Sequence, residues 1–295
     1  MIPSAGRTGK AAPTSTRGWS RERGAGHARP TPSREEPPVS VLSAVLDAAR
    51  SGAVEVVDLT TPLQASTPIL ELPPPLANTS PFRLEELSRY DDRGPAWYWN
   101  DIHTGEHTGT HLDAPVHWVT GRDGRDVSQA PLSTLVAAAA VIDLTAEVER
   151  DADFLLEVEH VRAWEAEHGG LPEGGWLLFR TGWASRGDDA AAFANADESG
   201  PHTPGVSPEC ARWLAEESPI SGFGVETVGT DAGAAHGFTP AFPCHHSLMG
   251  AGKWGLTSLR HLDRLPATGA LLVVCPLPIV GGSGSPARVL ALVER

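Results

Sequence analysis

Short apolar runs bounded by glycine and proline alternate with amphipathic segments along most of this 295-residue chain. Runs of β-branched and other apolar residues predict buried strands, which we expect at residues 54–63, 137–145, 176–183, 221–227, 269–275 and 288–294. Apolar residues at helical spacing predict helices over 40–52, 158–170 and 207–218. In the third helix Ser207 suits the N-cap and Pro208 the first helical position. The alternation predicts a mixed α/β fold, a single compact domain of β-sheets flanked by helices over residues 39–295.

The first 38 residues differ in composition from the rest of the chain. They are rich in Pro, Gly, Ser and Arg, and they carry seven Lys or Arg against three Asp or Glu. Such a segment cannot bury enough apolar surface to offset the entropy lost on ordering. We therefore expect a disordered N-terminal extension over 1–38, and its lack of an apolar stretch argues against a secretory signal.

Charge and cysteine content exclude several classes of function. The net charge of −14 argues against a nucleic-acid partner. The longest apolar stretch, residues 269–280, contains two prolines and is too short to span a membrane. The three cysteines, Cys210, Cys244 and Cys275, form no CxxC pair, which favours reduced thiols. We therefore expect a cytoplasmic protein that acts on a small molecule.

Residues 107–117, HTGTHLDAPVH, combine three histidines with an aspartate. Glycine and proline in this segment disfavour a helix, and the HExxH pattern of zinc proteases is absent. In extended chain His107, His111, Asp113 and His117 would share one face, but a straight strand would hold the first two about 13 Å apart. We therefore expect the chain to bend at Gly109 so that both histidines reach one ion.

Two histidines and one carboxylate form a ligand set that suits Zn, Mn or Fe and leaves open positions for water and substrate. His117 lies just beyond these ligands and is a candidate general base. The alternative is an ordinary polar loop. A non-haem iron oxygenase that uses His111, Asp113 and the distant His245 is a second alternative, and a non-catalytic binding or scaffolding subunit is a third.

The segment HTGTHLDAPVH matches in full the pattern HxGTHxDxPxH, and here the sequence resembles the cyclase family of metal-dependent hydrolases. Bacterial kynurenine formamidase and isatin hydrolase are members of that family. Further family-like segments include VDLTTPL, RTGW, GVET, PCHHSLMGAGKWGLTSL and GGSGSPARVLALV. The resemblance implies a swivelling β/β/α cyclase-like fold and assembly as a homodimer or homotetramer.

The resemblance also implies an activity and a set of site residues. It implies hydrolysis of a C–N bond in a small cyclic or aryl amide, with lactone hydrolysis or cyclisation in a biosynthetic pathway as the alternative. His107, His111 and Asp113 would bind the metal, and His117 would be the catalytic histidine.

Family members with a second metal use a later histidine and a glutamate twelve residues further on. Here His245 fits the histidine, with His246 as its alternative, but Thr257 replaces the glutamate. We therefore expect one divalent ion per chain, Zn or Mn.

Several other residues are candidates for lesser roles. Trp97, Trp99 and Trp118 flank the motif and are candidates for the wall of an aromatic-binding pocket. Glu106 has the wrong parity to join the ligands, and we expect it to be solvated. Asp231 is either an ordinary turn residue or a partner that orients a histidine. GGSGSP, residues 281–286, is expected to form a turn between two strands. Cys244, beside His245, is a weak candidate for a catalytic thiol.

Overall fold

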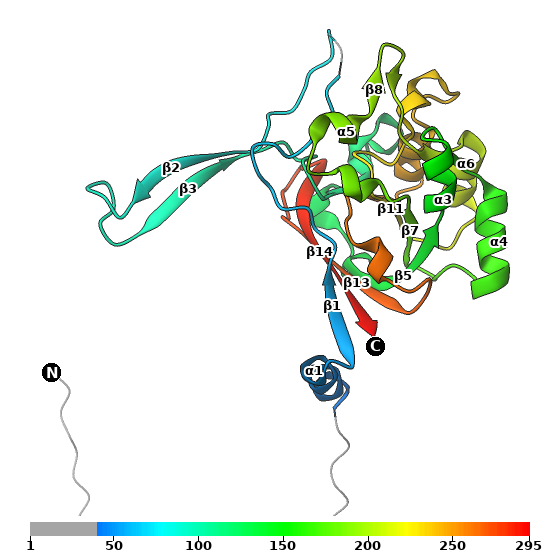
Figure 1. Ribbon diagram of the computed structural model, residues 1–295, viewed down its shortest axis with the longest axis horizontal. Coiled ribbons are helices and arrows are strands. Elements are labelled where there is room, and N and C mark those ends of the chain that lie inside the picture. The colour runs from blue at the N-terminus through cyan, green and yellow to red at the C-terminus, as the bar shows by residue number, and fades with distance from the viewer. Residues whose placement is uncertain (1–39, 73) are drawn as a thin grey trace, which may run out of the picture. The chain divides into compact units, whose positions relative to one another are not determined.

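A sheet of eight strands forms the centre of the protein (Figure 1). Seven of the eight strands close into a ring. The computed structural model describes residues 40–72 and 74–295, so the extension predicted over 1–38 lies outside the described residues. The strand order is β1-β14-β13-β5-β7-β11-β12-β4, and β4 pairs with β14 as well as with β12. In chain order the strands are β1 (Val54–Asp58), β4 (His111–Asp113), β5 (Val136–Asp143), β7 (Trp176–Arg180), β11 (Gly222–Val225), β12 (Trp254–Thr257), β13 (Ala270–Pro276) and β14 (Gly284–Glu294).

The sheet is mixed in direction. Strands β5, β7, β11 and β12 pair in parallel with one another. Strands β1, β13, β14 and β4 make antiparallel pairs. This arrangement confirms the predicted mixed α/β class.

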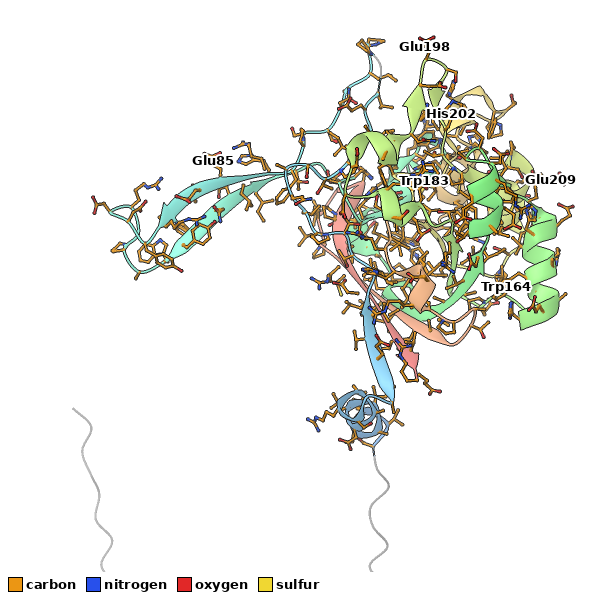
Figure 2. All side chains as sticks on the ribbon, viewed as in Figure 1. Glu85, Trp164, Trp183, Glu198, His202 and Glu209 are labelled. Carbon is orange, nitrogen blue, oxygen red and sulfur yellow. The ribbon has the colours of Figure 1, made fainter. Side chains whose placement is uncertain are left out.

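Each face of the sheet contributes to a separate hydrophobic cluster. In β7, Trp176 and Leu178 belong to a cluster shared with β1, β12, β13 and β14, whereas Leu177 and Phe179 face the helices α4 (Val158–His168) and α6 (Pro208–Glu216). A strand buried on both faces needs a continuous apolar sequence, which explains the run WLLF. Trp164 of α4 also donates a hydrogen bond from Nε1 to the Val141 carbonyl, at 2.9 Å (Figure 2).

The predicted helices are present with small changes at their ends. The first is α1 (Val41–Ser51), none of whose residues is buried. Helix α6 begins as expected, because Ser207 Oγ accepts a hydrogen bond from the Cys210 amide and Pro208 occupies the first turn. Three shorter α-helices are α2 (Leu132–Leu135), α3 (Thr145–Arg150) and α5 (Ala190–Ala194).

The remaining elements are small. Three two-stranded sheets pair β2 (Arg83–Arg89) with β3 (Tyr98–His103), β6 (Leu155–Leu156) with β10 (Gly205–Val206), and β8 (Ala196–Asp197) with β9 (Gly200–Pro201). The hairpin of β2 and β3 projects away from the main sheet (Figure 1). Single helical turns are η1 (Pro115–His117), η2 (Val119–Gly121), η3 (Val127–Gln129), η4 (Trp183–Arg186), η5 (Gly233–Gly237), η6 (His245–Met249) and η7 (Leu262–Arg264).

The predicted segments 54–63 and 281–286 differ most from the structure. Strand β1 stops at Asp58 rather than at residue 63. The segment 281–286 is not only a turn, because β14 already begins at Gly284 and its first three residues pair with β4. Local turn chemistry cannot reveal this pairing, since β4 lies about 170 residues earlier in the chain. The β2–β3 hairpin and the short β12 were not predicted.

The helices of residues 40–72 and 74–295 do not meet the requirements of a membrane span. None of these helices has the length and apolar character needed to cross a bilayer.

Candidate metal centre

The chain turns sharply between His107 and His111. Gly109 has φ +62°, in the left-handed region, and a Cβ built there would lie 2.7 Å from Leu63 Cδ2. The turn brings the His107 and His111 ring centroids to 5.1 Å. The bend predicted at Gly109 is confirmed.

Two imidazole rings converge on one carboxylate oxygen. Oδ1 of Asp113 lies 2.7 Å from His107 Nδ1 and 3.2 Å from His111 Nε2. His111 Nδ1 lies 2.7 Å from the Gly109 carbonyl, which can only accept, so Nδ1 carries a hydrogen and Nε2 is the ring nitrogen that faces Asp113. Ligand atoms on one ion, each bonded at about 2.1 Å, lie about 3 Å apart. The side chains whose ligand atoms all lie within 4.8 Å of one another, and which could hold a metal ion, are His107, Asp113 and His117. That group contains two of the three predicted ligands together with the predicted base, and His111 reaches it through Asp113 Oδ1.

The carboxyl group of Asp113 is suited to bind a cation. Its side chain is buried, and burial alone would raise the pKa of the carboxyl. The charges of His111 and His107 and their hydrogen bonds outweigh burial and hold the pKa of Asp113 well below its ordinary value. The group is a carboxylate at neutral pH.

His117 stands beside this cluster on the turn η1, which begins at Pro115. Its ring stacks on that of His107, with centroids 3.9 Å apart, and meets the His245 ring edge-on at 5.5 Å. Burial is the largest effect on the pKa of His117 and lowers it. The charge of Asp113 raises the pKa, the neighbouring histidines lower it, and the result is a pKa of about 4. The ring is therefore neutral at pH 7, as a proton acceptor must be. A ring nitrogen of His117 also lies within 4.8 Å of ligand atoms of His107 and Asp113.

Asp231 holds His245 in place. Its Oδ2 lies 2.5 Å from His245 Nδ1, and its Oδ1 accepts from the Cys244 amide at 2.7 Å. The other ring nitrogen, Nε2, faces Asp113 Oδ2 at 3.9 Å. Burial lowers the pKa of His245, but the hydrogen bond and charge of Asp231 and the charge of Asp113 raise it overall. Of the two roles considered for Asp231, the structure shows the orienting one.

The two histidines of PCHHSLMG have different surroundings. The ring of His245 joins the cluster, whereas His246 contributes its backbone carbonyl, which accepts a hydrogen bond from Thr120 Oγ1 at 2.7 Å. The buried Cys244 is no nucleophile, because desolvation, followed by the charge of Asp231, raises the pKa of its thiol well above the ordinary value.

Thr257 lies next to the first ligand set rather than at a separate site. It is directly opposite His111 in the pairing of β12 with β4. Its buried Oγ1 lies 2.9 Å from His111 Nδ1 and 3.1 Å from Nε2. The position at which a second metal would need a carboxylate therefore carries a hydroxyl.

Of the three tryptophans predicted to form a pocket wall, the structure brings one to the cluster. The Trp118 ring lies 5.0 Å from His245 and 5.6 Å from Phe242. Trp97 and Trp99 instead pack edge-on against each other at 6.1 Å, at the exposed β2–β3 hairpin. Proximity in sequence does not bring them to the site, because the chain leaves the hairpin before it enters the motif.

Two residues of the site were not foreseen. Glu106, expected to be solvated, accepts hydrogen bonds from the backbone amide and the hydroxyl of Ser283. Ser283 Oγ in turn lies 2.9 Å from His107 Nε2, the ring nitrogen that faces away from Asp113. Only the adjacency of Glu106 to a ligand hinted at this contact, since Ser283 is 176 residues from His107.

The family model described as putative cyclase matches residues 57–232, which include the whole cluster up to Asp231. The chain belongs to the cyclase family. The resemblance inferred from HTGTHLDAPVH is thereby confirmed.

Comparison with curated relatives and solved structures agrees. The chain is 47% identical over 259 residues to an isatin hydrolase of Roseibium aggregatum, a match that covers 87% of this chain and 98% of the relative. It is 30% identical over 185 residues to a kynurenine formamidase of Salinibacter ruber, covering 62% of this chain and 74% of that protein. A crystal structure of an isatin hydrolase bound to the product analogue thioisatinate superposes with a TM-score of 0.84 at 46% identity, covering 88% of this chain and all of that one.

Proposed function

We propose that this member of the cyclase family is a metal-dependent hydrolase that cleaves the C–N bond of a small cyclic amide of the isatin type. The observation that carries the proposal is the convergence of His107 Nδ1 and His111 Nε2 on Asp113 Oδ1, beside the neutral ring of His117. The 47% identity to an isatin hydrolase over almost that protein's full length supports the substrate class.

We assign a role to each side chain of the cluster from its surroundings. A divalent ion bound by His107, His111 and Asp113 would lower the pKa of water and polarise the substrate carbonyl. His117 accepts the proton of the attacking water and passes it to the leaving nitrogen. Asp231 fixes the orientation of His245, whose free nitrogen faces the same region. Trp118 and Phe242 offer flat apolar surfaces to an aromatic substrate.

The proposed cofactor is one divalent ion per chain, zinc or manganese. Nitrogen and carboxylate ligands suit both metals. The hydroxyl of Thr257, in the place of a carboxylate, supports a single ion. Elemental analysis of the purified chain tests this, and two ions per chain with Thr257 intact would contradict it.

A hydrolysis screen tests the activity. Metal-loaded protein is mixed with isatin, with N-formylkynurenine and with small lactones, and we expect the highest kcat/KM for isatin. A preference for N-formylkynurenine would indicate the formamidase activity, and a preference for lactones would indicate the alternative. The reaction should proceed equally well without oxygen. Loss of activity under anaerobic conditions would favour the iron oxygenase, which leaves His107 without a role.

We also propose that the protein is a cytoplasmic homodimer or homotetramer. Exposed apolar side chains on the β2–β3 hairpin support assembly, since Leu84, Tyr90 and Ile102 are more than half exposed, at 51%, 69% and 66%. Cys210, Cys244 and Cys275 are all free, which fits a reducing compartment. Size-exclusion chromatography with light scattering tests the assembly, and a monomer at micromolar concentration would contradict it.

A further inference from the structure

The edge of the His107 ring that faces away from Asp113 meets a second carboxylate through a serine. His107 Nε2 lies 2.9 Å from Ser283 Oγ, and this hydroxyl donates to Glu106 Oε2 at 2.6 Å. The Ser283 backbone amide donates to the same oxygen at 3.1 Å. Three residues thus form the chain carboxylate–hydroxyl–imidazole, which continues on the inner side of the ring to Asp113.

The direction of these hydrogen bonds determines which ring nitrogen can bind a metal. A carboxylate only accepts, so the single hydrogen of the Ser283 hydroxyl points to Glu106. Towards His107 the same oxygen can therefore only accept, and Nε2 must carry the hydrogen. In the metal-loaded site this arrangement leaves the lone pair of Nδ1, the atom next to Asp113, for the ion.

The glycines of GGSGSP make this contact possible. A Cβ at Gly284 would lie 2.6 Å from His107 Cε1 and 2.7 Å from the Leu112 carbonyl oxygen. A Cβ at Gly282 would lie 2.9 Å from Glu106 Oε1. Neither approach leaves room for a side chain. The segment that the sequence presents as a simple turn is therefore shaped to fit the His107 ring and Glu106.

We propose that Glu106 and Ser283 are positioning residues that hold His107 as an Nδ1 ligand and thereby raise the affinity of the site for its divalent ion. Histidine ligands are commonly fixed by a hydrogen bond from the ring nitrogen that does not bind the metal, and loss of such partners typically lowers metal affinity about 10–100-fold. The proposal rests on the proposed metal site but not on the identity of the substrate.

The test compares three full-length variants by competition for zinc with a chromogenic chelator. Ser283→Ala should weaken zinc binding about 10–100-fold, because Nε2 loses its acceptor. Glu106→Gln should cause a smaller loss, because the amide oxygen still accepts from Ser283 but the charge is gone. The control is Asp126→Asn, since Asp126 Oδ2 accepts from the Gly281 amide at 2.8 Å and so holds the same loop from a point remote from His107. We expect its zinc affinity to stay within about 3-fold of wild type.

A second measurement separates positioning from loop stability. Long-range ¹H–¹⁵N spectra of the histidine-labelled zinc protein report which ring nitrogen carries hydrogen, and His107→Asn identifies the signals. Wild type should show a hydrogen on Nε2 of His107, and Ser283→Ala should show a mixture. Melting temperatures of the metal-free variants should fall no more for Ser283→Ala than for Asp126→Asn.

The outcomes distinguish the positioning role of Glu106 and Ser283 from the proposed hydrolase function. Equal zinc affinities for Ser283→Ala, Glu106→Gln and Asp126→Asn would overturn the positioning role and leave only loop stability. The expected order of affinities in a protein that hydrolyses no cyclic amide would uphold the positioning role and refute the proposed function. A wild-type chain that binds no zinc or manganese would refute both.

Discussion

The His107 and His117 rings stack with their centroids 3.9 Å apart and their planes inclined by 28°. Ten residues separate them in the chain, and both reach this position because the backbone turns at Gly109 and again at Pro115. The stacking places a proposed ligand and the proposed base face to face. A shift in either ring would therefore disturb both metal binding and proton transfer.

Removal of His111 should abolish metal binding. His111→Ala takes away one of the three proposed ligands, so we expect metal content well below one ion per chain and hydrolysis reduced by more than the factor of about 100 seen for outer partners of a ligand. Elemental analysis and steady-state kinetics give the two readouts. His246→Ala is the matched control, and retention of both metal and activity in His111→Ala would disprove the site assignment.

Substitution of Asp231 should impair turnover without loss of metal. Asp231→Asn keeps an oxygen for the Cys244 amide but presents an amide group to His245 Nδ1 in place of a carboxylate. The ring then loses its preferred tautomer, and we expect kcat to fall about 10–100-fold at unchanged metal content. An unchanged kcat would show that His245 takes no part in the reaction.

The bend at Gly109 should be costly to alter. Gly109→Ala combines a positive φ with a Cβ 2.7 Å from Leu63, whereas Gly252→Ala has φ +73° with nothing within 4 Å. Urea unfolding of the metal-free proteins should show a loss of about 1 kcal/mol for Gly252→Ala and a larger one for Gly109→Ala. Equal losses would mean that Leu63 moves aside without cost.

One thiol of three should react in the native protein. Cys275 is exposed, while Cys210 and Cys244 are buried. Desolvation, followed by the charges of nearby glutamates, raises the pKa of Cys210 to about 12, and the pKa of Cys244 is also raised. Ellman's reagent should therefore titrate one thiol per folded chain at pH 8 and three in denaturant. Rapid reaction of two or three native thiols would contradict the burial.

The bend within the motif of residues 107–117 was predictable from the sequence. A strand rises about 3.3 Å per residue, so His107 and His111 could share an ion only if Gly109 bent the chain. The contacts of this segment with the rest of the chain were not predictable. Ser283 and Thr257 approach the motif only because β4 pairs with β14 and β12, and no local pattern encodes that pairing. The prediction that Glu106 is solvated was wrong for a related reason. It assumed the alternating faces of a strand, but residues 104–110 are not a strand.

The double pairing of β4 has a consequence for the order of events during synthesis. His111 and Asp113 leave the ribosome long before residues 254–257 and 284–286, which hold them in place on either side. A nascent chain that carries the whole motif therefore cannot form this arrangement until residues 284–286 have also been made. A chain that ends before residue 284 should therefore lose the proposed ion although His107, His111 and Asp113 are all present.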